Sequence, residues 1–179
     1  NLALAYTLRI EGDEADNLEK AINAYQEVLQ IYTRDEFPQD WAITQHNLAL
    51  AYYDRIQGER LDNLNKSITA CHNALEIYNR HPFIQERAAM YFYLGNAHLD
   101  GNDFSTAYHA YNKAIKSVDN LHNEVYSGQE VKQKIAERWY KLYQQMVRNC
   151  LELNKITEAL EYVERSKNRS LVELILERD

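Results

Sequence analysis

The chain has 179 residues, enough for one domain or a short solenoid with a buried core. Its formal net charge is −7, and the first 112 residues carry 16 acidic and 8 basic side chains, a balance that argues against binding of nucleic acid, which needs a basic surface. No run approaches the roughly 18 apolar residues of a membrane span, and Cys71 and Cys150 lack the spacing of a metal site or a disulfide framework. We therefore expect a cytoplasmic protein that contacts neither membrane nor nucleic acid.

An internal duplication dominates the sequence. The stretch Asn-Leu-Ala-Leu-Ala-Tyr occurs at residues 1–6 and again at 47–52, and residues 1–46 align with 47–92 at 22 identical positions. Chance would give about one match in ten to twenty. A repeat of about 20 to 50 residues is typical of stacked-repeat folds. We therefore predict an all-α solenoid of about four antiparallel helix pairs.

The predicted helices are long and joined by short turns, because the chain has only 5 Gly and 2 Pro to interrupt them. Each helix carries apolar residues at the three- and four-residue spacing of an amphipathic helix. Asp16-Asn17 and Asp62-Asn63 offer N-caps, and Pro38 suits a first helical turn. In chain order the helices are expected near residues 1–10, 16–32, 38–57, 62–80, 83–99, 103–120, 130–153 and 157–178.

The repeats are not all of one length. In the third, 13 positions separate Leu94 from Ala107, whereas 19 separate Leu48 from the equivalent Ser67. The longer spacing predicts roughly one to two extra helical turns around Gly58. A single solenoid over 1–179 then divides into repeats near 1–36 (truncated), 37–81, 82–121 and 124–179, the last with a longer final helix.

Residues 94–114 resemble the tetratricopeptide (TPR) repeat. The residues that carry the resemblance are Leu94-Gly95-x-Ala97-His98, then Asn102-Asp103-Phe104, Ala107, Tyr111 and Ala114. The family has Leu-Gly-x-Ala-Tyr, Gly-Asp-Tyr, and then Ala, an aromatic residue and Ala at the same spacing, so His98 is a departure. The 46-residue units look like the expanded variety found in large bacterial proteins. The resemblance implies a right-handed superhelix whose first helices line a concave groove.

A weaker match and a narrower resemblance follow towards the end of the chain. The weaker match to the repeat consists of Cys150, Asn154, Ile156, Ala159 and Val163. Residues 159–174 are similar to the helix that links such repeats to a C-terminal caspase-like CHAT domain. In those proteins the repeats are a sensor or docking arm. The resemblance implies a regulatory arm of a larger bacterial protein, and it confers no activity on this chain.

No signature of an active site is present in the sequence. Cys71-His72 is the only neighbouring Cys/His pair, and adjacent side chains on a helix point about 100° apart, so they cannot form a nucleophile–base hydrogen bond. Cys71 aligns with Tyr25, an inward position, which favours a buried thiol. The six histidines lack metal-ligand spacing, and no phosphate-binding loop occurs. We predict a non-catalytic protein without cofactor or metal.

The family geometry places candidate partner-binding residues on the first helix of each pair. Carried over by position, they are His46, Leu50, Tyr53, Asp54, Phe92, Asn96, Leu99, Gln144 and Arg148, with Ala89, Asp100, Lys141, Leu151 and Glu152 beside them. A groove of this mixed character suits a helix or an extended segment. The alternative is that Leu50 and Leu99 pack against second helices. The Lys and Asn pairs of the carboxylate clamp, which holds chaperone tails in some relatives of this fold, are absent.

Two functions remain after these exclusions. The first is a protein-interaction module that docks a peptide or a partner domain in the concave groove. The second is a structural spacer that associates with copies of itself through apolar repeat ends. The first predicts a monomer in solution, and the second predicts association that depends on concentration.

Overall fold

The computed structural model describes the backbone of residues 13–80, 82–124 and 129–176, and the side chains of residues 13–80, 82–120 and 140–166. Every regular element in these ranges is an α-helix, as the sequence predicts. The helices are α2 (Glu14–Ile31), α3 (Pro38–Asp54), α4 (Arg60–Tyr78), α5 (Ile84–Asp100), α6 (Phe104–Glu124), α7 (Gln129–Glu152) and α8 (Ile156–Leu176). The helix expected at residues 1–10 lies outside the described residues.

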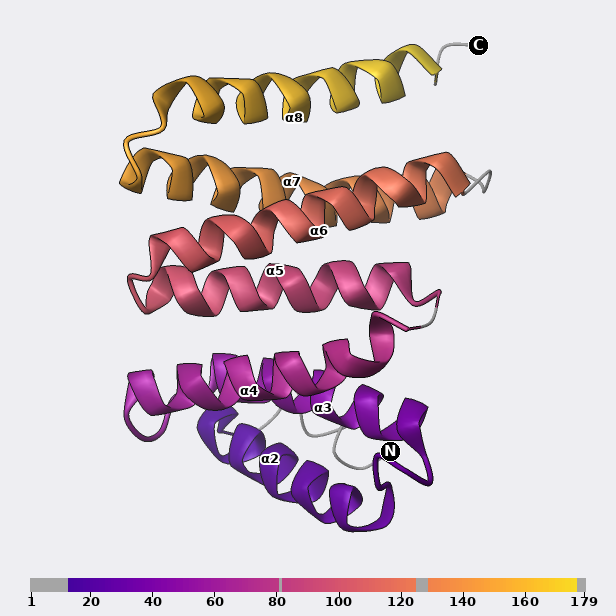
Figure 1. Ribbon diagram of the computed structural model, residues 1–179, viewed down its shortest axis with the longest axis vertical. Helices are drawn as coiled ribbons and strands as arrows, with labels where there is room; N and C mark the ends of the chain where they lie inside the picture. The colour runs from indigo at the N-terminus through magenta and orange to yellow at the C-terminus, as the bar shows by residue number, and fades with distance from the viewer. Residues whose placement is uncertain (1–12, 81, 125–128, 177–179) are drawn as a thin grey trace.

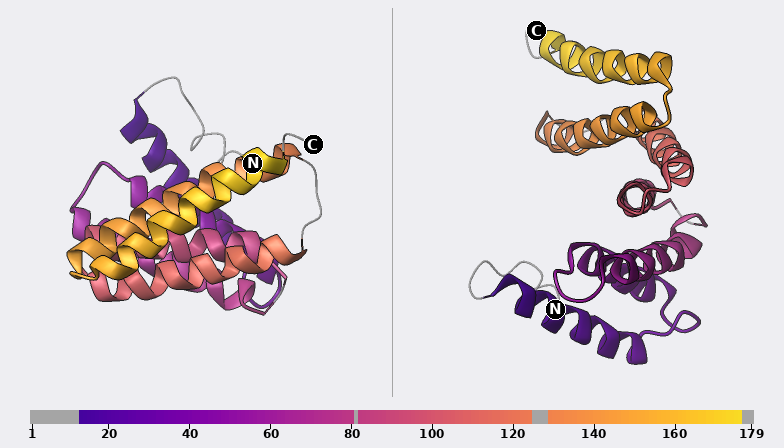
Figure 2. Two further views of the ribbon diagram at one scale, coloured as in Figure 1. Left: turned by 90° about the horizontal axis from the view of Figure 1, so that it is seen from above. Right: turned by 90° about the vertical axis from the view of Figure 1, so that its left-hand side faces the viewer.

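The helices stack in chain order, from α2 at the bottom of Figure 1 to α8 at the top. Successive helices pack against each other, and the most extensive contacts are those between α3 and α4 and between α5 and α6. The helix axes turn along the stack, because α5 is seen nearly end-on in the right-hand view of Figure 2 while α8 lies across it. The predicted all-α solenoid of consecutive helix pairs is confirmed.

One side of the stack is defined by contacts between alternate helices. In addition to its chain neighbours, α5 contacts α3 on one side and α7 on the other. No contact of that extent joins α2, α4, α6 and α8 to one another within the described part of the chain. The first helices of successive pairs therefore contact one another, whereas the described second helices do not to that extent. A stack with this arrangement curves towards its first helices, which form the concave side. The inner side is therefore formed by α3, α5 and α7.

Two turns of the same construction, 52 residues apart, connect the helices of the last two pairs. Asn102 (φ 62°) and Asn154 (φ 56°) both occupy the left-handed region, which asparagine tolerates better than most residues. Each asparagine N–H donates to the carbonyl three residues before it, at 3.0 Å. The next residue, Asp103 or Lys155, donates its N–H to the carbonyl five residues before it, at 2.8 Å. This arrangement satisfies the last carbonyls of α5 and α7.

In the longer second repeat, the additional residues are divided between the loop before α4 and the start of α4. The loop between α3 and α4 spans residues 55–59, two residues more than the loop 101–103 between α5 and α6, and α4 has one additional turn at its start. Gly58, with φ +80°, allows the chain to reverse in the longer loop. The expected one to two extra helical turns are thus one turn and a longer loop.

Asn63 holds the longer loop instead of capping α4. The helix begins at Arg60, so Asn63 lies inside its first turn and is fully buried. Its side-chain amide donates to the Gln57 carbonyl at 2.7 Å, and its side-chain oxygen accepts from Arg55 Nη1 at 3.2 Å. Arg55 also forms a bidentate ion pair with Glu19 of α2, at 2.6 and 2.8 Å. The N-cap prediction for Asp62-Asn63 is wrong, because both residues lie inside α4, which begins at Arg60. Asn63 holds the loop by hydrogen bonds instead, and the ion pair of Arg55 connects the loop to the preceding repeat.

The earlier copy of the motif is displaced in the same way. Asp13 is the N-cap of α2 and its carboxylate accepts from the Asp16 N–H at 3.1 Å. Asn17 lies inside the helix and is buried. The N-cap prediction for Asp16-Asn17 is therefore also wrong, by about one turn of helix.

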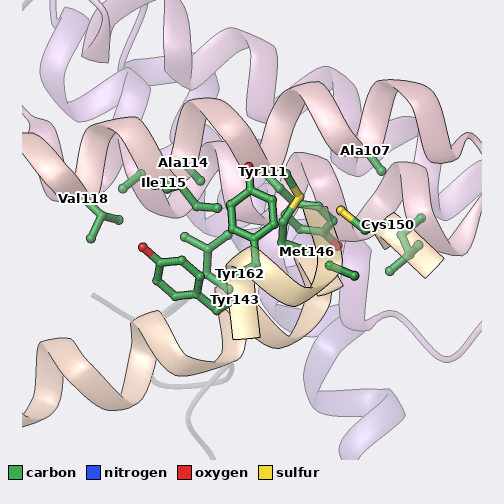
Figure 3. Close-up of a cluster of buried hydrophobic side chains, with 13 residues drawn as sticks. Ala107, Tyr111, Ala114, Ile115, Val118, Tyr143, Met146, Cys150 and Tyr162 are labelled. Carbon is green, nitrogen blue, oxygen red and sulfur yellow. The ribbon is translucent and has the colours of Figure 1, made fainter. Parts of the chain in front are cut away.

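Tyrosines fill the core between the pairs, as Figure 3 shows for Tyr111, Tyr143 and Tyr162 from α6, α7 and α8. Tyr111 lies directly against Gly95 of α5, where a Cβ would be 2.5 Å from the ring. The equivalent residues of the preceding repeat are Ala49 and Cys71, which belong to one buried cluster. A large inward residue on the second helix is thus matched by the smallest residue on the first.

Candidate interaction surface

An aromatic ladder, which consists of Tyr53 of α3 and of Tyr93 and Phe92 of α5, lies at the contact between two inner helices. The Tyr53 and Tyr93 ring centroids are 6.0 Å apart, and those of Tyr93 and Phe92 are 5.7 Å apart. Both pairs meet edge to face, a preferred geometry for aromatic rings. All three side chains are half-buried, so they offer apolar surface in fixed orientations.

Tyr111 of α6 supports the ladder from beneath. Its ring centroid lies 6.2 Å from that of Phe92, and its hydroxyl donates to the Asn96 side-chain oxygen at 2.8 Å. Burial raises the pKa of Tyr111, and nearby Tyr53 and Asp100 raise it further. The phenol therefore remains protonated, and it fixes Asn96 as a buried hydrogen-bond acceptor.

A charged cluster lies at one end of the ladder. The Tyr53 hydroxyl donates to Asp100 Oδ2 at 3.0 Å, and Arg60 at the start of α4 forms an ion pair with the same oxygen at 2.7 Å. The Arg60 guanidinium also lies over the Tyr53 ring, 4.9 Å from its centroid, and donates to the Tyr53 carbonyl. Burial, with the Asp100 carboxylate next, raises the pKa of Tyr53 to about 12. Tyr53 is therefore a neutral donor held between two helices.

Arg148 of α7 extends this surface to the fourth repeat. Its side chain is exposed, and its positive charge acts to lower the pKa of Tyr111, against the effect of Asp100. An exposed guanidinium can bind a carboxylate of a partner at little desolvation cost. The ladder, Asp100, Arg60 and Arg148 together form what we call the inner surface.

The structure brings some of the nine predicted residues to this surface and leaves others elsewhere. Tyr53, Phe92 and Arg148 are part of it, and Gln144 is exposed one turn from Arg148 on α7. Asn96 is only 9% exposed and Leu99 only 3%. Leu99 belongs to the core between α5, α6 and α7, so the packing alternative holds for it, and Asn96 contributes by orienting Tyr111.

The remaining predicted residues belong to α3. His46 lies against Tyr78 of α4, with ring centroids 6.2 Å apart. Leu50 is partly buried against the core between α3, α4 and α5. Asp54 is exposed near the start of α2, and burial together with Glu14 raises its pKa while Arg60 lowers it. These three residues do not join the aromatic ladder.

Sequence reasoning missed two members of the inner surface, Tyr93 and Arg60. Tyr93 corresponds to Asn47 in the preceding repeat, so no repeated pattern marks it. Arg60 lies on a second helix, at the end of the longer loop, outside the positions that the family geometry assigns to a groove. Asp100 was among the positions named beside the predicted groove residues. No other feature of the sequence indicated that a charged cluster forms there.

The residues considered for catalysis occupy places that suit packing. Cys71 is completely buried, and burial raises the pKa of its thiol to about 12. His72 next to it is exposed. Within the residues that the structure describes, no group of three or more His, Cys, Asp or Glu side chains is arranged to hold a metal ion. None of the described helices is both long and apolar enough to cross a membrane.

These features define a helical-repeat protein with a half-buried aromatic surface on the inner side of its stack. Comparison with protein-family models gives no match, and neither does comparison with curated proteins.

Proposed function

We propose that this chain is a non-catalytic, tetratricopeptide-like interaction module of the bacterial cytoplasm, which docks a helix or an extended segment of a protein partner on the inner surface. The observation that carries the proposal is the aromatic ladder: three half-buried rings at the junction of two repeats, fixed from beneath by Tyr111. Binding energy concentrates on aromatic and arginine residues in such settings.

The chemistry of the inner surface favours a particular kind of segment. The rings supply a flat apolar area, which suits one or two apolar side chains spaced along a helix or strand. Arg148 then lies where an acidic residue of the partner would complete a charge-assisted hydrogen bond. The Tyr53–Asp100–Arg60 cluster is already paired internally, so its role is to orient the ladder.

The proposal is tested by affinity capture from bacterial lysate with three forms of the protein. The first is the parent chain and the second carries Tyr53→Ala, Phe92→Ala and Arg148→Ala. The third is a matched control with three exposed residues of the second helices replaced, Lys66→Ala, Lys116→Ala and Glu161→Ala. We expect one protein to be captured by the parent and the control and to be lost at least about tenfold from the inner-surface variant.

The parent and both variants must show the same helical circular dichroism for this comparison to count. Equal capture of that protein by all three folded forms would contradict docking on the inner surface. Loss from the control alone would place the binding site on the outer side.

A second candidate function, self-assembly through a repeat end, is favoured by a specific apolar face. Leu151, Ile156 and Leu160 are between 51% and 61% exposed. With an offset of 52 residues they correspond to Leu99, Phe104 and Tyr108, which pack against the core that α7 and α8 complete.

The contacts at the covered face show what such a partner would provide. Asn149 of α7 donates to the Phe104 carbonyl at 3.0 Å, and the Lys155 ammonium lies 4.3 Å from the Tyr108 ring centroid. A helix pair of a second copy could cover Leu151, Ile156 and Leu160 in a comparable way. Sedimentation at increasing concentration tests this: association that Leu151→Glu and Leu160→Glu abolish supports it, and a monomer at every concentration excludes it.

A further inference from the structure

A hollow of about 380 Å³ lies on the outer side of the stack, between α4 and α6 and over α5. Leu94 and His98 of α5 line it. They lie two positions from Phe92 and Asn96, and two positions on a helix correspond to about 200° of rotation. The hollow is therefore on the opposite side of α5 from the inner surface, and its chemistry is independent of the proposed function.

A second hollow, of about 320 Å³, occupies the equivalent place one repeat earlier. The α3 residues that line it are Gln45, Leu48 and Tyr52, and the residues 46 positions later are Tyr91, Leu94 and His98, which line the 380 Å³ hollow from α5. The α4 residues that line it are Lys66, Thr69 and Asn73, and the residues 40 positions later are Thr106, His109 and Lys113, which line the 380 Å³ hollow from α6. The fold thus builds the same concavity twice.

The two hollows differ in the groups that line them. The earlier one contains amides, a threonine and one lysine, and its floor residue Tyr52 accepts a hydrogen bond from Gln26 at 2.9 Å. In the later hollow the equivalents of Gln26 and Tyr52 are His72 and His98, and His109 joins them from α6. Three successive helices thus each contribute one imidazole to a single hollow.

The carboxylates near the later hollow already have partners. Glu76 of α4 forms an ion pair with Arg34 at 2.7 Å. Asp103, before α6, accepts from the Thr106 N–H at 3.1 Å and lies 3.3 Å from His98 Nδ1. Lys113 is the lining cation that remains: its ammonium is directed towards the Tyr91 ring, 5.3 Å from its centroid, and has no carboxylate against it among the described ion pairs.

The imidazoles of His72, His98 and His109 face the hollow from α4, α5 and α6. An imidazole that binds a proton adds positive charge to the hollow. The other charged groups that face it are Glu76 and Lys113. Burial lowers the pKa of His98 and so does the charge of His72, while Asp103 raises it. A positive charge on His72 thus opposes the protonation of His98, and a bound anion would offset that repulsion.

We propose that this hollow binds a small organic anion, with its apolar body on Leu75, Leu94 and Ala110 and its carboxylate or phosphate held by Lys113 and the imidazoles. The volume is within the range of small-molecule sites, roughly 300 to 1,000 Å³. The apolar floor and the cationic rim favour an amphiphilic anion over an inorganic one. The affinity increases as the pH falls.

The test follows the histidine side-chain NMR signals of the folded chain during titration with benzoate, phenyl phosphate and inorganic phosphate, at about pH 6 and pH 8. We expect saturable shifts with benzoate or phenyl phosphate, and an affinity at least about fivefold higher at the lower pH. The better of these two identifies the oxyanion. Inorganic phosphate should bind at least about tenfold more weakly, because it has no apolar body.

Two variants distinguish this site from non-specific binding. Lys113→Ala with His109→Gln should reduce the affinity at least about tenfold, whereas Lys66→Ala in the equivalent hollow should leave it unchanged. All three substitutions are at exposed positions, and circular dichroism checks that the helices remain. Absence of saturable shifts, equal affinity at both pH values, equal binding of inorganic phosphate, or equal loss from Lys66→Ala would overturn the proposal.

Discussion

Gly95 packs directly against the ring of Tyr111, and this contact explains why glycine follows Leu94 when alanine follows Leu48. An added Cβ would stand 2.5 Å from the Tyr111 ring, well inside any real contact distance, and Tyr111 is completely buried and cannot move aside. The equivalent pair Ala49 and Cys71 fills the same space with the volumes exchanged. In one repeat the larger residue is therefore on the second helix and the first helix has glycine, and in the other repeat a smaller residue on the second helix is matched by alanine.

We predict that Gly95→Ala destabilises the protein by about 1 to 3 kcal/mol through overpacking. Tyr111→Cys alone should cost about 3 to 5 kcal/mol by leaving a cavity. In the double variant the methyl group and the thiol reproduce the Ala49–Cys71 pair, so the two losses should not add, with a favourable coupling of about 1 to 3 kcal/mol. Urea denaturation of the four forms measures the cycle, and strict additivity would contradict this account of Gly95.

His98 makes the stability depend on pH. Its pKa is lowered from the ordinary value of about 6.5, mainly because it is partly buried. The folded protein therefore binds the proton less readily than the unfolded chain does. The contribution of His98 to the free energy of unfolding is fully present above about pH 6.5 and falls as the pH drops through the two pKa values.

We predict that His98→Tyr, which installs the residue found at the equivalent position 52, reduces this loss of stability between about pH 7.5 and pH 5. The measurement is the difference in urea-unfolding free energy between the two pH values, for the parent and the variant. The other titrating groups are common to both proteins. An equal difference in the two would show that His98 does not titrate in this way.

At the scale of elements, the connection between helix pairs matters as much as the helices. In the second repeat the loop 55–59 is held by Asn63 from within α4 and by Arg55 to Glu19 of α2. In the third repeat the two helices are joined by a turn of only three residues, with Asn102 in the left-handed region. The longer loop thereby ties neighbouring repeats together.

We predict that Asn63→Ala destabilises the protein by about 2 kcal/mol, because the hydrogen bonds of the buried Asn63 side chain to the Gln57 carbonyl and from Arg55 are both lost. Asn65→Ala, at an exposed position on the same helix, is the control and should cost less than about 0.5 kcal/mol. Thermal unfolding of both variants is sufficient. Equal effects would mean that Asn63 does not anchor the loop.

The sequence predicted the helices well, because the 46-residue duplication and the amphipathic spacing are strong signals. It misplaced the starts of α2 and α4 because Asp-Asn is the usual residue choice for an N-cap, and the same side chains can also hold a loop from inside a helix. Only the folded loop, with Gln57 and Arg55 in place, distinguishes the two uses.

The interaction surface was only partly predictable for a different reason. The position on a helix shows which stripe a residue belongs to, and Tyr53, Phe92 and Arg148, which it assigns to the groove, lie on the inner helices α3, α5 and α7. It could not show that Leu99 is covered by the following repeat, or that Arg60 reaches across from α4. Both depend on how far each pair rotates relative to the next, which is a property of the packed stack.

At the scale of the whole molecule, the extensive contacts among the described helices join the two helices of one pair or helices of neighbouring pairs. α5 is the element with the most partners: it packs against α3, α4, α6 and α7. In such a solenoid, stability is close to a sum of repeat and interface contributions, so the ends open first.

We predict that amide hydrogen exchange is slowest in α5 and faster in α2 and α8. Among the described helices, α2 makes extensive contacts only with α3, and α8 only with α7. Exchange followed by mass spectrometry on peptides from the three helices tests this order. Protection in α8 or α2 that equals the protection in α5 would show that the stack opens as a single cooperative unit.

The central claim is that the inner surface is where a protein partner binds, and site-specific photo-crosslinking tests it most directly. Benzoylphenylalanine would replace Phe92 on the inner side in one protein and His109 on the outer side in another, and each would be irradiated in bacterial lysate. The account predicts one discrete crosslinked protein from position 92 that position 109 does not yield and that Arg148→Ala weakens. The same crosslinked protein from both positions, or one from position 109 alone, would contradict it.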